Sequence, residues 1–288
     1  MNIKGYMRLM RPQQWVKNVF VLMPAFFAGT IVETAPLCDS LLAFAMFCMI
    51  SSAVYCFNDM SDVESDRRHP VKRTRPIASG AVSMSGAAIF ACFLTVASIL
   101  GALWLLNAEV MWVIISYLAL NILYTSILKK LPLVDISIVA LGYVLRLLAG
   151  SFAADCTLSS WIVVIAFMLC LFLVLGKRRE DGDALQSKKE GQRPVYSKPF
   201  IDIAMSITCA IVICAYLIYS IVPSSTRVIN SPYFYTTGLP VIIGLLRYLQ
   251  ICMTTNSGGS HSAVLFKDFI IVGSIIVYLA IYICLYYF

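Results

Sequence analysis

Charged residues and histidines are scarce in this chain. Asp, Glu, Lys and Arg make up 13% of its 288 residues, hydrophobic residues make up 60%, and there are only two histidines. A soluble domain carries about 25% charged residues, so the composition excludes that class and indicates an integral membrane protein. Both histidines are isolated in the sequence, which leaves no plausible catalytic histidine.

The ten cysteines lack the spacing of metal-binding motifs. Most lie within or beside apolar runs and are interpreted as small core residues. Cys38 and Cys156 fall in predicted outer loops, where a disulfide between them stays open. The N-terminal segment also lacks the short apolar stretch and cleavage site of a removable signal peptide, so we expect it to be retained.

Apolar runs long enough to cross a bilayer of about 30 Å recur along the whole chain. They predict an all-α integral membrane protein of about nine transmembrane helices, with the weakest signal in the first. No linker marks off a soluble domain, so residues 1–288 are expected to form a single transmembrane catalytic domain. The predicted spans lie near residues 16–32, 38–57, 82–105, 109–128, 133–150, 158–176, 200–222, 236–254 and 266–288.

All but two of the 22 Lys and Arg residues fall on one side of these spans. Because positively charged loops stay in the cytoplasm, we expect a cytoplasmic N-terminus, an external C-terminus and cytoplasmic chemistry. The two longest polar loops follow the second and sixth spans, which suggests an internal repeat around a shared central cavity. The net charge of +7 would also suit nucleic acid. However, basic residues gathered beside a membrane favour anionic lipid and substrate phosphates, so no nucleic-acid partner is expected.

An acidic stripe follows the second span. Asn58, Asp62 and Asp66 recur every four residues, so on a helix they share one face, with Asp59 beside its first turn. Crowded carboxylates repel one another, and an all-oxygen set with room for water suits Mg²⁺ that also holds a substrate phosphate. A solvated charged loop would explain the charges but not their phasing.

Basic and amide residues precede the first span and follow the stripe. Trp15 with Arg11 and Lys17 would anchor the chain at the headgroups, but Gln14 and Asn18 add hydrogen-bonding groups that anchoring does not need. The run from Arg67 to Pro76 suits phosphate directly.

Further along the chain, Lys129 and Lys130 follow Tyr124 at a predicted turn. Asp135, just inside the next span, is expected to face a wet cavity or to pair with a basic group, and Arg146 lies deeper on nearly the same face.

A second charged run closes the sixth span. Its cations would suit any helix C-terminus, or they would bind a phosphorylated ligand. Its carboxylates would then be available to a second metal. The residues are Lys177, Arg178, Arg179, Glu180, Asp181 and Asp183.

The pattern Asn58-Asp59-x-x-Asp62-x-x-x-Asp66 resembles the first aspartate-rich motif of the UbiA prenyltransferase superfamily. The basic run that ends at Pro76 is one residue shorter than the looser family pattern. The resemblance implies nine helices, a cytoplasmic active site and a side opening to lipid. Within the superfamily, the segments 11–18, 66–80 and 176–178 are similar to the decaprenyl-phosphate phosphoribosyltransferase branch.

That branch uses 5-phosphoribosyl 1-diphosphate as donor and a polyprenyl phosphate as acceptor. The resemblance therefore implies a lipid-linked pentose for cell-envelope glycans, made at a bacterial inner membrane. It also implies that Mg²⁺ is held by Asn58 and the catalytic carboxylates Asp59, Asp62 and Asp66. Candidate substrate-binding residues are Arg11, Gln14, Lys17, Asn18, Lys72, Arg73, Tyr124, Lys130, Lys177 and Arg178.

Two rival functions stay open. One is a prenyltransferase that attaches an isoprenyl diphosphate to an aromatic acceptor. Such enzymes usually carry a second Asp-x-x-x-Asp motif, and residues 177–183 depart from it. The other is a transporter in which Asp135 and Arg146 line an anion path, although a transporter needs no aspartate stripe phased for metal.

Overall fold

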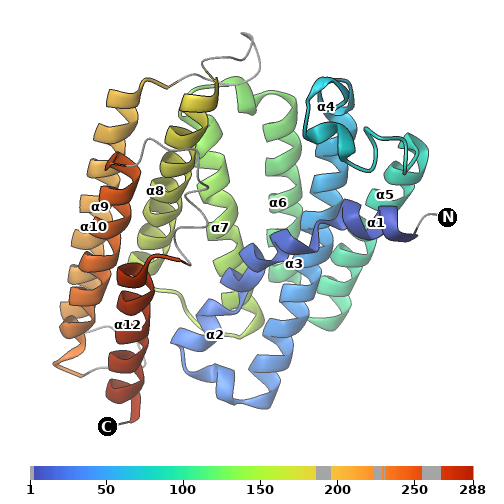
Figure 1. The fold of residues 1–288 in the computed structure, drawn as a ribbon. Helices are drawn as coiled ribbons and strands as arrows, with labels where there is room; N and C mark the ends of the chain where they lie inside the picture. The colour runs from blue at the N-terminus through green and yellow to red at the C-terminus, as the bar shows by residue number, and fades with distance from the viewer. Residues whose placement is uncertain (1–2, 186–195, 223–228, 230, 255–266, 288) are drawn as a thin grey trace. The chain divides into compact units, whose positions relative to one another are not determined.

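The computed structural model describes residues 3–185, 196–222, 229, 231–254 and 267–287 (Figure 1). Every regular element in these ranges is helical, as predicted. The elements are α1 (Ile3–Met10), η1 (Pro12–Val21), α2 (Met23–Phe27), η2 (Thr30–Val32), α3 (Thr34–Ser61), α4 (Val63–Arg68), η3 (Lys72–Thr74), α5 (Met84–Leu105), α6 (Ala108–Ser126), η4 (Leu128–Lys130), α7 (Val134–Ala153), α8 (Ser160–Leu185), α9 (Lys198–Ile221), η5 (Phe234–Thr237), α10 (Gly238–Thr254) and α12 (Phe269–Tyr287).

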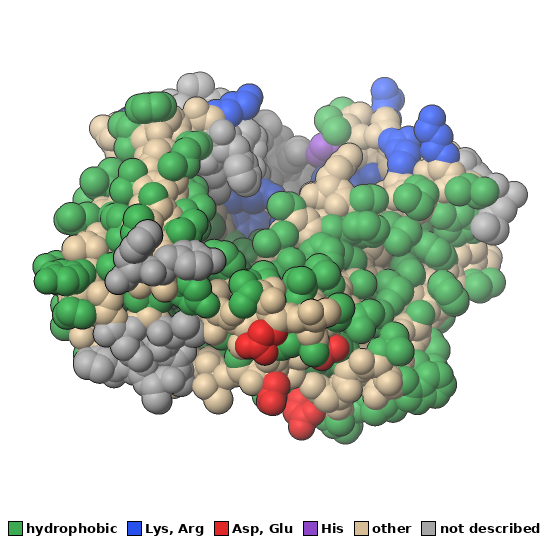
Figure 2. Space-filling view, turned by 90° about the horizontal axis from the view of Figure 1, so that it is seen from below, with side chains coloured by type: hydrophobic (Ala, Val, Ile, Leu, Met, Phe, Trp, Pro, Cys, Tyr) green, Lys and Arg blue, Asp and Glu red, His purple; other side chains and the backbone are tan. Residues whose placement is uncertain are grey.

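Eight helices in the described ranges are long and apolar enough to cross a membrane. They match the predicted spans from the second onward. Large apolar side chains such as Ile89, Trp104 and Phe269 are exposed, at 72%, 75% and 89%. Exposed apolar side chains of this kind suit a protein surrounded by lipid. In Figure 2 hydrophobic side chains are spread over much of the face in view.

Residues 16–32, predicted near the first span, do not form one continuous helix. That segment divides into η1, α2 and η2. Pro24 removes a backbone donor and disfavours helical geometry at the residue before it. Gly29, with φ of 73°, takes a left-handed conformation that ends α2.

Side-chain caps fix where several membrane helices begin. Ser83 Oγ accepts from the Gly86 N–H at the start of α5, at 3.1 Å. Asn107 Oδ1 accepts from the Val110 N–H at the start of α6, at 2.9 Å. Each cap satisfies a backbone donor that has no partner inside the helix.

The chain divides into two compact units, which are described separately. Unit 1 comprises Met1–Leu128 and Leu145–Thr157, and unit 2 comprises Lys129–Val144 and Leu158–Phe288. Helix α7 contributes its first half to unit 2 and its second half to unit 1.

In unit 1, α3 packs against both α5 and α6. Phe47, Ile50 and Ile114 are fully buried in the core between these helices. Segment η1 approaches α7 closely at Gly150, where a Cβ would lie 1.9 Å from the Val21 carbonyl oxygen, so a glycine is required there. Cys38 and Cys156, also in this unit, are free thiols, so the disulfide considered above does not form.

In unit 2, α8 packs against α9, and α10 packs against α12. Phe172 and Met205 are fully buried between the helices, and the Phe172 ring meets Tyr248 edge-on at 5.3 Å.

Candidate functional site

The aspartate segment keeps helical hydrogen bonding as the chain passes from α3 to α4. The Asp62 N–H donates to the Asn58 carbonyl at 3.0 Å, and the Asp66 N–H donates to the Asp62 carbonyl at 2.8 Å. Asp62 itself, with φ of −98° and ψ of 7°, marks the interruption between the two helices. The four-residue phasing predicted from the sequence is therefore present in the backbone.

Two of the carboxylates are buried in a network with two arginines. Asp59 and Asp66 are each 2% exposed. Arg75 Nη1 donates to Asp59 Oδ1 at 3.1 Å and to Asp66 Oδ2 at 2.6 Å, while Arg11 also donates to Asp59 Oδ1. We call these four residues the Asp59 cluster. Buried charges must be paired, and the two arginines supply the counter-charge for these carboxylates inside the fold.

The backbone of Arg11 is held in an unusual conformation. Its φ of 52° and ψ of 60° place a non-glycine residue in the left-handed region, immediately before Pro12. The guanidinium lies 5.1 Å from the centre of the Tyr55 ring, within cation–π range. Strain of this kind costs about 1–3 kcal/mol and is concentrated at functional positions.

The Asp59 cluster fits a divalent metal by donor chemistry. Asp59 Oδ2 is buried and has no hydrogen-bond partner, which leaves a carboxyl oxygen inside the protein that a cation could use. Asn58, Asp62 and Asp66 offer further oxygens of the kind that Mg²⁺ prefers.

The arrangement of these donors differs from a formed metal centre. Within the ranges described, no three Asp, Glu, His or Cys side chains surround one point. Arg11 and Arg75 both contact Asp59 Oδ1, and Arg75 also contacts Asp66 Oδ2. Metal binding would therefore exchange arginine contacts for metal contacts.

Asn18 has a structural place in unit 1. It is fully buried, and its amide donates to Cys48 Sγ at 3.3 Å and to Ser51 Oγ at 3.2 Å. Its Oδ1 accepts from Arg146 Nε at 2.8 Å, and Arg146 Nη2 donates to the Tyr117 hydroxyl at 3.0 Å. The geometry thus gives Asn18 the task of holding a buried guanidinium, where the sequence suggested substrate contact.

The remaining candidates of unit 1 lie at its surface or are half-buried. Lys72 and Arg73 are exposed in η3, while Gln14, Lys17 and Tyr124 are half-buried. Asn58 is half-buried and accepts a hydrogen bond from Thr125 Oγ1 on α6.

In unit 2, Asp135 is fully buried and pairs with a basic group, as predicted. Arg178 Nη2 donates to its Oδ2 at 2.7 Å. The Tyr196 hydroxyl donates to Asp135 Oδ1 and accepts from the Leu133 N–H at 2.6 Å. Burial and the hydrogen bond to Asp135 raise the pKa of Tyr196 to about 12, so its hydroxyl stays protonated at neutral pH.

The basic run at the end of α8 has mixed surroundings. Lys177 is exposed, as is Lys130 in η4. Arg179 is buried, donates to Asp202 at 2.6 Å and also donates to the carbonyl oxygens of Cys252 and Met253, so it is a structural residue. The side chains of Asp181 and Asp183, considered for a second metal, lie outside the described residues.

Sequence reasoning missed three of these contacts. It gave Arg75 only the phosphate-binding role of the whole basic run, and it did not single out Thr125 or Tyr196. Arg75 carried a signal, because it follows a group of crowded carboxylates that need a counter-charge. Thr125 and Tyr196 carried none, since their partners are 67 and 61 residues away in the sequence.

Residues 19–270 match the model of the UbiA prenyltransferase family. The chain belongs to this family. It is 33% identical over 274 residues to a decaprenyl-phosphate phosphoribosyltransferase of Corynebacterium glutamicum, covering 92% of this chain and 81% of the relative. It is 32% identical over 257 residues to a protein of the same name from Mycobacterium tuberculosis, covering 85% of this chain and 82% of the relative.

The UbiA fold is also shared with solved structures. A UbiA homolog from Archaeoglobus fulgidus bound to DMAPP and Mg²⁺ superposes with a TM-score of 0.75. The two proteins are 19% identical, and the alignment covers 96% of this chain and 98% of the homolog. At that identity the likeness establishes the fold and leaves the substrate to be argued from the site.

Proposed function

We propose that this UbiA-family protein transfers a 5-phosphoribosyl group from 5-phosphoribosyl 1-diphosphate to a polyprenyl phosphate. The observation that carries the proposal is the buried Asp59 cluster, in a chain 33% identical to a protein named decaprenyl-phosphate phosphoribosyltransferase. The cluster supplies both signs of charge that a diphosphate site needs, namely carboxylates for a cation and guanidiniums for phosphate.

Mg²⁺ is the proposed cofactor, held by Asp59, Asp62 and Asp66 with Asn58 beside them. When bound, the ion would neutralise charge on the leaving diphosphate. The free Oδ2 of Asp59 is available without breaking any hydrogen bond.

The arginines of the cluster have a second use in this scheme. If Asp59 and Asp66 held the cation, Arg11 and Arg75 would be free of their ion pairs. A guanidinium binds phosphate oxygens with two parallel hydrogen bonds, so each freed arginine can hold the donor. Further candidates for its phosphates are Gln14, Lys17, Lys72, Arg73, Tyr124, Lys130, Lys177 and Arg178.

The reaction needs little proton transfer. The bond from C1 of ribose to the diphosphate oxygen breaks, and diphosphate leaves with the electron pair. A phosphate oxygen of the acceptor, already anionic at neutral pH, forms the new bond to C1. No strong general base is required, which agrees with the scarcity of histidine.

We place the reaction at the cytoplasmic face of a bacterial inner membrane, in a protein that acts as one catalytic domain over residues 1–288. This orientation rests on the distribution of Lys and Arg. The acceptor's isoprenoid chain would lie in lipid beside the apolar helices.

The experiment that tests the proposal offers purified protein radiolabelled phosphoribosyl diphosphate, a polyprenyl phosphate and Mg²⁺. We expect label in the organic phase from the native protein and none from Asp62→Ala. Label that stays in water, from a preparation that instead consumes an isoprenyl diphosphate and an aromatic acceptor, would assign the rival prenyltransferase reaction. Solute uptake into proteoliposomes without any product would assign transport.

A further inference from the structure

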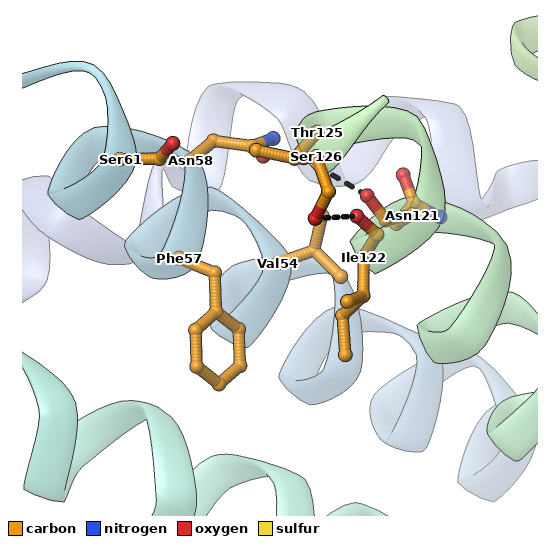
Figure 3. A pocket seen from close by; sticks show the side chains of 8 residues that line it. All are labelled: Val54, Phe57, Asn58, Ser61, Asn121, Ile122, Thr125 and Ser126. Atoms are coloured by element: carbon orange, nitrogen blue, oxygen red, sulfur yellow. Dashed lines mark hydrogen bonds between the residues drawn. The ribbon is translucent and has the colours of Figure 1, made fainter. Parts of the chain in front are cut away.

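A cavity of about 240 Å³ lies between α3 and α6 in unit 1, beside the aspartate segment. Each helix contributes four side chains to it (Figure 3). Polar side chains lie along the upper part of the view in Figure 3, with Val54, Phe57 and Ile122 below them. The polar lining residues are Asn58, Ser61, Asn121, Thr125 and Ser126.

The side-chain amides of Asn58 on α3 and Asn121 on α6 present opposite groups to the cavity. Asn121 Nδ2 donates to the Tyr117 carbonyl at 2.8 Å, which leaves Oδ1 as an acceptor for the cavity. Asn58 Oδ1 accepts from Thr125 Oγ1, which leaves the two N–H groups of Nδ2 as donors. The Thr125 hydroxyl also lies 2.9 Å from the backbone carbonyl oxygen of Asn121, so its single proton is shared between that oxygen and Asn58 Oδ1. The cavity therefore offers a neutral donor and a neutral acceptor on facing walls.

Neutral hydroxyl groups match this lining better than phosphate or an isoprenoid chain. None of the eight lining residues is charged. Helix α6 ends at Ser126, so the negative end of its dipole lies at the cavity and disfavours an anion. The volume is below the about 300–1,000 Å³ of sites for drug-sized ligands, which suits one sugar ring rather than a polyprenyl chain.

Asn58 belongs both to this cavity and to the aspartate motif. In a sugar 1-diphosphate the ring is joined directly to the diphosphate through C1, so a ring-binding site must adjoin the diphosphate site. We infer that the cavity binds the ribose hydroxyls of the donor, and that Asn121 and Thr125 determine specificity for a sugar over a prenyl donor. The inference rests on the proposed function and adds to it the group that recognises the sugar.

The test compares Asn121→Leu and Thr125→Val with the native protein. Donors are phosphoribosyl diphosphate and its 2-deoxy and 3-deoxy analogues. Losing one hydrogen bond should lower kcat/KM for the full donor by about 2- to 12-fold. The native protein should discriminate against at least one deoxy analogue, and Asn121→Leu should lose that discrimination. Inhibition by inorganic diphosphate, which has no ribose, should be unchanged.

Thr95→Val is the matched control. Thr95 on α5 donates to the Ala91 carbonyl at 2.9 Å and does not line the cavity, so its variant should match the native protein in every assay. The inference is overturned if Asn121→Leu and Thr125→Val behave as this control does, or if inhibition by diphosphate weakens in parallel with the donor. In both cases the native protein still transfers phosphoribose, so the proposed function stands and only this inference falls. A native protein that transfers no phosphoribose would instead overturn the proposed function, and this inference with it.

Discussion

Arg75 joins the two buried carboxylates, and its replacement by glutamine should be costly to the fold. Breaking a buried ion pair by removing one partner costs about 3–5 kcal/mol. The cost should be lower here, because Arg75 is 27% exposed and Arg11 still forms an ion pair with Asp59. We therefore expect a loss of about 2–3 kcal/mol, which corresponds to a fall in Tm of roughly 4–12 °C. Thermal unfolding of the purified protein in detergent measures it.

The same variant also tests the exchange of arginine for metal. Arg75→Gln frees Asp66 Oδ2 and leaves Arg11 alone on Asp59 Oδ1, so Mg²⁺ should raise its Tm by more than it raises that of the native protein. Arg67→Gln is the control, because Arg67 forms an exposed pair with Glu64 at 3.3 Å that is worth at most about 1 kcal/mol. The reasoning fails if Arg75→Gln unfolds like Arg67→Gln, or if Mg²⁺ shifts the native protein and Arg75→Gln equally.

Three further outcomes are expected. Asp62→Asn should abolish turnover, because it replaces a proposed metal ligand, and it should keep the native Tm, because Asp62 is only half-buried at a helix junction. Near-native turnover in a transfer assay would count against a role in metal binding. Asn18→Ala should lower stability by about 1–3 kcal/mol through the lost partner of Arg146, with the KM for the donor unchanged, and a raised KM would contradict the structural role. Arg247 hydrogen-bonds Asp268 and lowers the pKa of that carboxyl. The pair therefore adds stability above the ordinary carboxyl pKa, and this stability is lost as the pH falls through the lowered pKa. Arg247→Gln should shift acid unfolding to higher pH, and an unchanged acid transition would refute the linkage.

Helix identity and most boundaries were predictable because each span has its own local signal. Long apolar runs and capping residues such as Ser83 are properties of neighbouring residues in the sequence. Hydrophobicity alone did not show that residues 16–32 divide into shorter helices, because Pro24 interrupts the helix whatever the hydrophobicity of its neighbours.

Only the part of the site that depends on residue spacing within one helix was predictable from the sequence. The phasing of Asn58, Asp62 and Asp66 follows from helical periodicity and is present in the backbone. Asp135 pairs with Arg178 on α8, although Arg146 on its own helix is nearer in the sequence. That choice depends on how the chain folds around Asp135. No local pattern carries that information.

The cavity between α3 and α6 lay furthest beyond sequence reasoning. Asn121 and Thr125 read as ordinary polar residues near the end of a span. They acquire a role only when the fold brings α6 against α3, opposite Asn58.

A donor competition measures the central claim most directly. Native protein and Asp62→Ala would each receive Mg²⁺, a polyprenyl phosphate, an aromatic prenyl acceptor, and equal amounts of phosphoribosyl diphosphate and an isoprenyl diphosphate. Mass spectrometry of the organic phase would then identify the products. The account predicts a polyprenyl phosphate that carries one 5-phosphoribosyl group, formed by the native protein and absent from Asp62→Ala. A prenylated aromatic product in its place, or an equal yield from Asp62→Ala, would contradict it.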